Sequence, residues 1–284
     1  MKAKWAELKG TGEYEEWVKS YLAEKGYSPT IFEKNEKLGK KLYITGKGRC
    51  NITNASDMDT LFASVVTNSK FLYSCFYGYT NQDVIDFFER IGVATKIERG
   101  NRVFPVSDHS SDVIAGLTRE LHQLGVEIHL HTGVKKIVGN ERFEYIELQD
   151  GRKIEGDACI VATGGFSYQT TGSTGDGYAM AKALGHTVIE PEGSLVPLET
   201  AGTTCQRMQG LSLRNVAVKL LDAKGKTLYK DFGELLFTHF GISGPTALSA
   251  SAHLKGEGCQ LIIDLKPALD EAKLNDRILR DLQM

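Results

Sequence analysis

The chain has 284 residues, a length that favours one large domain or two smaller ones and is sufficient to bury a hydrophobic core. Hydrophobic residues make up 41% of the sequence and charged residues 25%, which argues against wholesale disorder and against a fibrous repeat. The 34 Lys and Arg residues nearly balance the 36 Asp and Glu residues. The resulting net charge of -2 argues against a nucleic-acid partner.

The composition also indicates where the protein resides. No apolar run approaches the roughly 20 residues of a membrane span, and the first ten residues lack the apolar stretch of a signal peptide. We therefore expect no membrane partner and a cytoplasmic location. The five cysteines are scattered and odd in number, which predicts reduced thiols and no structural zinc site. The excess of 30 Gly over 6 Pro fits an α/β fold that cradles a ligand.

Hydrophobic periodicity predicts alternating helices and strands in the first part of the chain. Helices are expected over residues 13–26, 81–91 and 110–124, with Ser110 and Ser111 as caps of the third. Strands are expected over residues 30–32, 126–130, 134–138, 143–148 and 152–154. Residues 158–162 (ACIVA) form a continuous apolar run, which predicts a strand covered on both faces. A loop rich in Gly and Lys is expected from Glu33 to Asn54.

The pattern changes after Thr163. A helix over residues 177–184 ends at Gly185, and short strand-like segments follow at 216–221, 235–238 and 261–265. We place a domain boundary near Gly185, which predicts one domain over residues 1–185 and a second over residues 186–284. The last segment, residues 268–282, has helical spacing, and we expect it to begin a layer that is missing.

Gly10 and Gly12 resemble two thirds of a G-x-G-x-x-G dinucleotide motif, and Glu33 follows at nearly the spacing of the acid that binds ribose hydroxyls. Glu15 stands in place of the third glycine, where its charge and bulk would oppose a pyrophosphate. The preceding residues are also too charged for a buried central strand. On this evidence alone, a plain turn before a helix is the stronger interpretation.

The segment Gly39–Asn54 (GKKLYITGKGRCNITN) combines three glycines with Lys40, Lys41, Lys47 and Arg49. Free backbone amides and positive charge suit a diphosphate, but a solvated basic loop explains the same residues equally well. Cys50, taken alone, is interpreted as a small buried hydrophobe.

A second glycine-rich region, Thr163-Gly164-Gly165, directly follows the apolar run, at the position where α/β sheets bind ligands. Its alternative is an ordinary turn. The sequence TGSTGDG (residues 171–177) then opens a helix whose amide-rich start suits an anion or a ring carbonyl, although Asp176 is equally well explained as a helix cap. His239 is interpreted as structural, and the other histidines show no metal-ligand spacing.

Five long segments together carry a family resemblance: IFEKNEKLGKKLYITGKGRCNITN, KFLYSCFYGYTNQD, ERGNRVFPVSDHSSDV, IVATGGFSYQTTGSTGDGYAMAKALGH and LLFTHFGISGP. They are similar to the BaiN-like, aminoacetone-oxidase-like family of NAD(P)/FAD-dependent flavoproteins. The resemblance implies an α/β fold with a Rossmann-like FAD/NAD(P)-binding domain and an inserted β-rich second domain, followed by the start of a helical part.

The resemblance also implies a cofactor site. Glu33 would bind the adenosine ribose, residues 39–51 would line the diphosphate and flavin, and Val134 would offer its backbone to adenine. The implied FAD-binding positions are Gly10, Gly12, Glu33, Lys34, Gly39, Lys40, Lys41, Thr45, Gly46, Lys47, Gly48, Arg49, Cys50, Asn51, Val134, Thr163, Gly164 and Gly165. Because the flavin carries the hydride, no catalytic acid or base is nominated, and no metal is expected.

Two departures from the family pattern shape the functional expectation. The glycine motif is degenerate at Glu15, and no flavin-closing Gly-Asp segment precedes Met284, so we expect a truncated chain. The first hypothesis is an oxidoreductase that transfers hydride between NAD(P)H, FAD and a small-molecule substrate. The alternative is a non-catalytic or incomplete relative that binds FAD weakly or not at all. In either case we expect self-association through surfaces that the missing segment leaves open.

Overall fold

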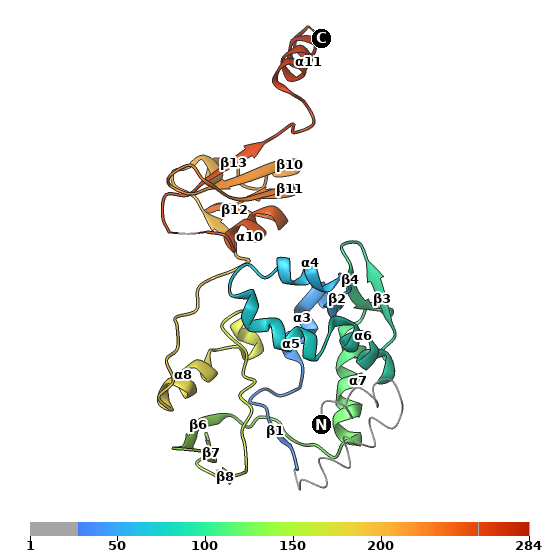
Figure 1. Cartoon of the computed structure of the whole chain (residues 1–284), viewed down its shortest axis with the longest axis vertical. Helices are drawn as coiled ribbons and strands as arrows, with labels where there is room; N and C mark the ends of the chain where they lie inside the picture. Colours follow the sequence, from blue (N-terminus) through green and yellow to red (C-terminus); the bar gives the residue numbers. More distant parts are fainter. Residues whose placement is uncertain (1–27, 255, 284) are drawn as a thin grey trace. The chain divides into compact units, whose positions relative to one another are not determined.

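A computed structural model of the chain describes residues 28–254 and 256–283 (Figure 1). The chain divides into two compact units, residues 1–189 and residues 190–284. Among the described residues, no helix combines the length and the apolar character that crossing a membrane requires. The helix expected over residues 13–26, with the turn at Gly10 and Gly12, lies outside the described residues.

A parallel strand pair organises the first unit. Strand β1 (Thr30–Phe32) consists of β-branched and aromatic residues and pairs in parallel with β5 (Glu127–His129), which places Ile31 opposite Ile128. The rings of Phe32 and His129 stack with centroids 5.2 Å apart. Because parallel strands end at the same edge of a sheet, the residues that follow β1 lie beside those that follow β5.

Two small antiparallel sheets complete the strands of this unit. The first has the order β2 (Thr53–Asn54), β4 (Arg102–Pro105) and β3 (Thr95–Glu98). The second has the order β6 (Val134–Gly139), β7 (Phe143–Leu148) and β8 (Lys153–Glu155). The turn between β7 and β8 contains Gly151 at φ 90°, as expected for the Asp-Gly pair there.

The helices of this unit are mostly short. They are α3 (Lys40–Ile44), α4 (Met58–Ala63), α5 (Tyr73–Gly78), α6 (Asn81–Arg90), α7 (Ser110–Gln123) and α8 (Asp176–Ala183), with 3-10 turns η1 (Thr45–Gly48), η2 (Ser69–Leu72) and η3 (Gln169–Thr171). Helix α6 begins at a capping box in which Thr80 and Asp83 satisfy each other's backbone N–H groups. The predicted helices over residues 81–91 and 110–124 are confirmed.

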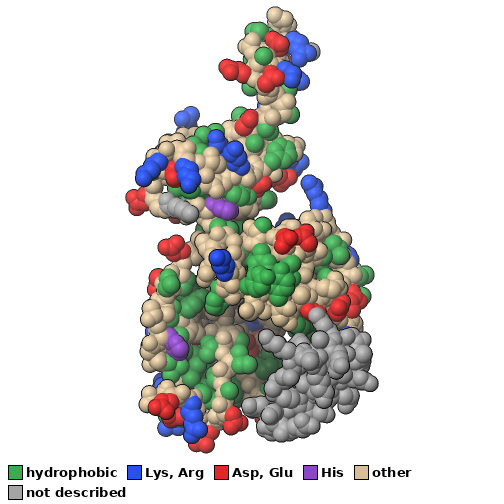
Figure 2. Space-filling view, in the orientation of Figure 1, with side chains coloured by type: hydrophobic (Ala, Val, Ile, Leu, Met, Phe, Trp, Pro, Cys, Tyr) green, Lys and Arg blue, Asp and Glu red, His purple; other side chains and the backbone are tan. Residues whose placement is uncertain are grey.

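The core of the first unit lies between α3, α6 and α7. Cys50, Val93 and Val113 are almost fully buried, and partly buried apolar side chains from all three helices pack around them. A different apolar group remains at the surface over α4 and α5 (Figure 2), where Tyr73 and Tyr77 stack with Phe62. Both tyrosines are more than half exposed.

Three sequence expectations are wrong in this unit. Residues 158–162 form no strand within the described part of the chain, and Ile160 is 92% exposed. An apolar run becomes a strand only where another backbone pairs with it, and no described strand does so here. The expected loop after Glu33 contains helix α3, and the N-cap of α7 is His109 rather than Ser110 or Ser111.

The second unit is built on an antiparallel sheet with the order β13-β10-β11-β12-β9. These strands are β9 (Leu198–Glu199), β10 (Ser212–Leu221), β11 (Thr227–Phe237), β12 (Gly241–Ser243) and β13 (Gln260–Asp264). The helices are α9 (Thr204–Arg207), α10 (Pro245–Ser251) and α11 (Glu271–Leu282). The core of this unit contains Val216, Val218 and Leu220, which alternate along β10, together with Leu235 of β11. Helix α10 covers this core with Ala247.

Candidate cofactor site

The segment after β1 meets the loop that precedes α8. The Lys34 ammonium donates to the hydroxyl Oγ1 of Thr174 at 2.6 Å and pairs with Oδ2 of Asp176 at 2.7 Å. This hydrogen bond from Lys34 holds the pKa of the Asp176 carboxyl below its ordinary value, with a smaller contribution from Thr174. Lys34, predicted to bind cofactor, and the residues 171–177 segment, whose start was expected to suit an anion or a ring carbonyl, are about 140 residues apart and are therefore joined by a charge-assisted contact.

Glu33 and Asn35 make a second connection between the same segments. Oε1 of the half-buried Glu33 carboxylate accepts hydrogen bonds from the backbone N–H and the side-chain Nδ2 of Asn35, each at 2.7 Å. Nδ2 also donates to the backbone carbonyl of Thr171 at 3.1 Å. Gly172 adopts φ 98°, which favours glycine, and a Cβ atom there would lie 2.6 Å from Nδ2 of Asn35.

Val134 follows a short segment that is hydrogen-bonded to the Glu33 region. The backbone N–H of Thr132 donates to the carbonyl of Glu33, and that of His131 donates to the carbonyl of Asn35, both at 2.9 Å. Strand β6 begins two residues later, at Val134. The predicted ribose acid and the predicted adenine contact are therefore on directly hydrogen-bonded segments.

Helix α3 begins at Gly39, which adopts φ 70°. A Cβ atom there would approach Ile114 of α7 to 2.8 Å, and a Cβ atom at Gly46 would approach the Phe104 ring to the same distance. These glycines let the basic segment pack closely against α7 and β4. Thr45, Gly46, Lys47 and Gly48 then form the 3-10 turn η1, in which Gly46 and Lys47 have left-handed backbone angles.

The four basic side chains of this segment differ in what they contact. Lys40 pairs with Glu36 at 3.2 Å, and the Lys41 ammonium donates to the backbone carbonyl of Ser167 and lies 5.0 Å from the Tyr168 ring centroid. In contrast, the exposed Lys47 side chain makes no hydrogen bond or ion pair with the described part of the chain. Of the four, Lys47 is thus the one whose charge no described protein group neutralises.

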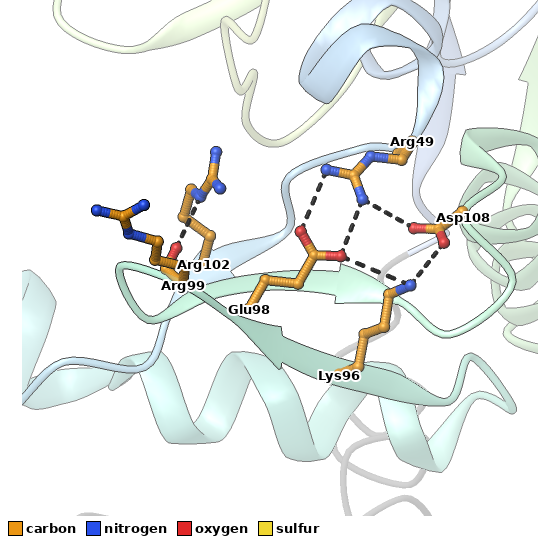
Figure 3. Close-up of polar contacts among 6 residues, drawn as sticks. All are labelled: Arg49, Lys96, Glu98, Arg99, Arg102 and Asp108. Atoms are coloured by element: carbon orange, nitrogen blue, oxygen red, sulfur yellow. Dashed lines mark hydrogen bonds and ion pairs between the residues drawn. The ribbon is translucent and has the colours of Figure 1, made fainter. Parts of the chain in front are cut away.

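Arg49 is neutralised by an ion-pair cluster that links η1 to β3 and to the segment after β4 (Figure 3). Its guanidinium binds both Glu98 carboxylate oxygens, at 2.9 and 3.2 Å, and Asp108 Oδ1 at 3.1 Å. Lys96 approaches the same Asp108 at 2.6 Å. The guanidinium also lies 4.0 Å from the Phe104 ring centroid.

These contacts change the proton affinities of the cluster. Hydrogen bonding to Glu98 raises the pKa of Arg49 above its ordinary value. The pKa of Glu98 is lowered chiefly by Arg49, and that of Asp108 chiefly by Lys96. Arg49, predicted to contact the cofactor, is therefore paired with acidic groups of the protein itself, and it links the basic segment to the β2-β4-β3 sheet.

Thr163, Gly164 and Gly165 lie against the start of α8. The Thr163 hydroxyl accepts from the backbone N–H of Gly177 at 3.1 Å, and the carbonyl of Gly165 accepts from Gly175 at 3.2 Å. A Cβ atom on Gly164, at φ 72°, would meet the Ser173 hydroxyl at 2.9 Å. The N-cap of α8 is Gly175, and Asp176 occupies its first turn.

Cys50 and Asn51 close the basic segment. Cys50 is 2% exposed, and burial raises the pKa of its thiol, so it is neutral and packs as an apolar side chain. The backbone N–H of Asn51 lies 3.0 Å from the place that a Cβ on Gly46 would occupy. Among the described residues, no group of three His, Cys, Asp or Glu side chains is arranged to hold a metal ion.

Most of the predicted positions lie in two regions, one around Glu33 and the other around η1. Gly10 and Gly12 lie outside the described residues. Asn35 belongs to the first region and was not predicted, whereas Thr171 begins the residues 171–177 segment that was expected to suit an anion or a ring carbonyl. Glu33, which lies two residues before Asn35, was the sequence signal for their contact, since polar side chains often form hydrogen bonds with the backbone two residues away.

A family model described as the HI0933-like protein Rossmann domain matches residues 19–244, most of the chain. The chain belongs to this family. The HI0933-like family comprises FAD-dependent oxidoreductases, and the predicted α/β Rossmann-like fold and flavoprotein family are thereby confirmed.

Two curated relatives of this chain carry different names. The chain is 28% identical over 250 residues to a 3-dehydro-bile acid delta(4,6)-reductase of Clostridium scindens, and 32% identical over 233 residues to a ribosomal RNA dihydrouridine synthase of Haemophilus influenzae. These alignments cover 86% and 81% of this chain but 59% and 56% of the relatives. A flavocytochrome c3 fumarate reductase structure matches 65% of this chain and 40% of its own at 14% identity, with a TM-score of 0.38.

Proposed function

We propose that the chain binds FAD and takes part in NAD(P)H-dependent reduction of an organic substrate. The proposal rests on one observation: Lys34 and Asn35 connect the Glu33 region to residues 163–177. A dinucleotide needs a hydrogen-bond acceptor for ribose and cationic or amide donors for diphosphate, and both are available here.

The residues fit FAD on three local observations. Glu33 keeps one carboxylate oxygen, Oε2, without a hydrogen bond among the described residues. The Lys47 charge is not neutralised by any described group, and the adjacent Gly46 approaches the Phe104 ring closely. Thr163, Gly164 and Gly165 present a second glycine-rich backbone at the start of α8.

The proposed roles follow from this arrangement. Glu33 would hold the adenosine ribose, Val134 the adenine edge, and η1 with Lys47 the diphosphate. Arg49 supports η1 through Glu98 and Asp108. FAD, when bound, would supply the two-electron carrier between NAD(P)H and the substrate. The protein's share is to bind the cofactor, orient it and exclude water.

The relatives' names and the net charge both bear on the substrate class. Both names describe reduction, of a 3-dehydro-bile acid in one case and of uridine in ribosomal RNA in the other. We propose a small unsaturated organic molecule because the net charge of -2 opposes a polyanion. RNA is the competing substrate, and the name of the Haemophilus influenzae relative favours it.

The test is a visible absorption spectrum of the purified chain, followed by titration with FAD. Bound flavin and NAD(P)H oxidation faster than that of free FAD would support the proposal. Colourless protein that does not bind added FAD would instead support the non-catalytic relative. Parallel assays with a bile-acid enone and with ribosomal RNA would separate the two substrate classes.

A further inference from the structure

We infer that Asn35 is the positioning residue for the ribose-binding carboxylate of Glu33, an inference that rests on the proposed FAD site. Asn35 uses two separate N–H donors, one from its backbone and one from its side chain, on the same oxygen, Oε1. Two bonds to one oxygen fix the plane of the carboxylate. They leave Oε2 as the acceptor for a ligand hydroxyl.

The side chain of Asn35 is itself held on the opposite side. Its Nδ2 has two hydrogens, and the second is directed to the Thr171 carbonyl at 3.1 Å. The close approach of Nδ2 to Gly172 leaves room for the amide only because that position lacks a Cβ. The rotamer of Asn35 is thus set by the residues 171–177 loop, and the orientation of Glu33 depends on that loop through Asn35.

The backbone around Glu33 is equally constrained. Its carbonyl accepts from Thr132, and the Asn35 carbonyl accepts from His131, each at 2.9 Å. The remaining freedom of Glu33 lies in its side chain, which Asn35 restrains. A preoriented acceptor lowers the entropic cost of binding, so removing the restraint should weaken adenosine recognition without altering the flavin end of the site.

The experiment measures FAD and riboflavin affinities of the full chain by fluorescence titration. Asn35→Ala should weaken FAD binding about 10-fold, the scale of one hydrogen bond to a charged group, and leave riboflavin binding unchanged because riboflavin lacks the adenosine ribose. Asn35→Asp keeps the shape but places a second carboxylate against Glu33, and its FAD loss should be larger. Asn81→Ala, which also removes an amide that donates to two backbone carbonyls, is the matched control and should retain wild-type affinity.

A double-mutant cycle separates positioning from general destabilisation. If Asn35 acts through Glu33, Asn35→Ala in a Glu33→Ala background should change FAD affinity by less than about 2-fold, because the group that it orients is gone. If Asn35→Ala does not fold, Asn35→Ser, which also removes the side-chain amide but keeps a small polar side chain, replaces it in the cycle.

The outcomes are distinguishable. Wild-type chain that does not bind FAD would overturn the proposed function. Wild-type binding with unchanged affinity in the Asn35 variants would overturn only the inference. Equal loss of riboflavin and FAD affinity, or additive losses in the cycle, would also overturn it, since Asn35 would then support the fold and not the carboxylate.

Discussion

At the scale of single residues, charge is distributed unequally along the basic segment. Lys40, Lys41 and Arg49 each contact a protein acceptor, whereas the Lys47 side chain contacts none in the described part of the chain. A cation that is already paired contributes little additional attraction to a ligand, because binding would first have to break the existing pair. Lys47 is therefore the side chain of this segment best suited to an anion.

We predict that Lys47→Ala weakens FAD binding by roughly 1.5 to 3 kcal/mol, the range for a hydrogen bond to a charged group. Titration with FAD at two salt concentrations measures the effect, which should shrink at high salt. Lys70→Ala removes an exposed charge from η2 and serves as the control. Equal affinities for the Lys47 and Lys70 variants would contradict the assignment of Lys47 to the diphosphate.

The ion-pair cluster predicts a pH dependence. Glu98 and Asp108 have folded pKa values below their ordinary values of 4.5 and 3.8, so the native state favours their ionised forms. Their contribution to stability is complete above the ordinary values and is lost as the pH falls through the lower folded values. In Glu98→Gln, the melting temperature should lie below that of the wild type at neutral pH.

The same variant provides its own control in acid. The difference in melting temperature between Glu98→Gln and the wild type should narrow as the pH falls from the ordinary value of 4.5 through the lower folded pKa of Glu98, because the wild-type carboxylate is protonated over that range, first in the unfolded and then in the folded state. A difference that stays constant from neutral to acidic pH would show that the pairing with Arg49 does not stabilise the fold.

At the scale of elements, glycines determine how closely helices pack. Gly116 lies on the buried face of α7, and a Cβ there would come within 2.5 Å of the Val93 side chain. Gly78 ends α5 and would meet nothing within 4 Å. Neither glycine has a positive φ, so the two differ in packing more than in backbone strain.

We predict that Gly116→Ala destabilises the first unit by about 1 to 3 kcal/mol, the usual cost of overpacking a core. Gly78→Ala should be neutral or slightly stabilising, since alanine is the better helix former. Urea denaturation of both variants measures the difference. A stable Gly116→Ala variant would mean that α7 moves away from Val93 at little cost.

At the scale of the whole molecule, the two units have separate hydrophobic cores. The cluster around Val113 belongs entirely to residues 1–189, and the cluster around Leu220 belongs entirely to residues 190–284. The sheet in the second unit pairs β10 with both β11 and β13, which places Leu220 and Val218 at its centre. A substitution in one core should therefore lower the stability of the unit to which that core belongs.

Leu220→Ala should destabilise the second unit by about 2 to 5 kcal/mol, because it leaves a cavity in a fully buried position. Leu279→Ala, at a half-exposed position of α11, is the control and should change stability by less than about 0.5 kcal/mol. Chemical denaturation followed by circular dichroism measures both. Equal effects would show that Leu220 does not belong to a packed core.

The sequence by itself determined the local elements and the family. Hydrophobic periodicity specifies α6, α7, β1 and the β6-β7-β8 hairpins because that signal acts within a few residues. The motifs also determine family membership, since the family model matches residues 19–244. The glycine-rich and basic positions of the candidate site were recognisable for the same local reason.

Only the tertiary structure decided which of those residues are available to a ligand. Arg49 is paired with Glu98 and Asp108, partners 49 and 59 residues away that no local pattern identifies. Asn35 joins Glu33 to Thr171 across 136 residues. The apolar run at 158–162 is no strand in the described part of the chain, because pairing depends on a neighbouring backbone and not on composition. Long-range contacts of this kind are set by how the elements pack, which is why composition and spacing could not reveal them.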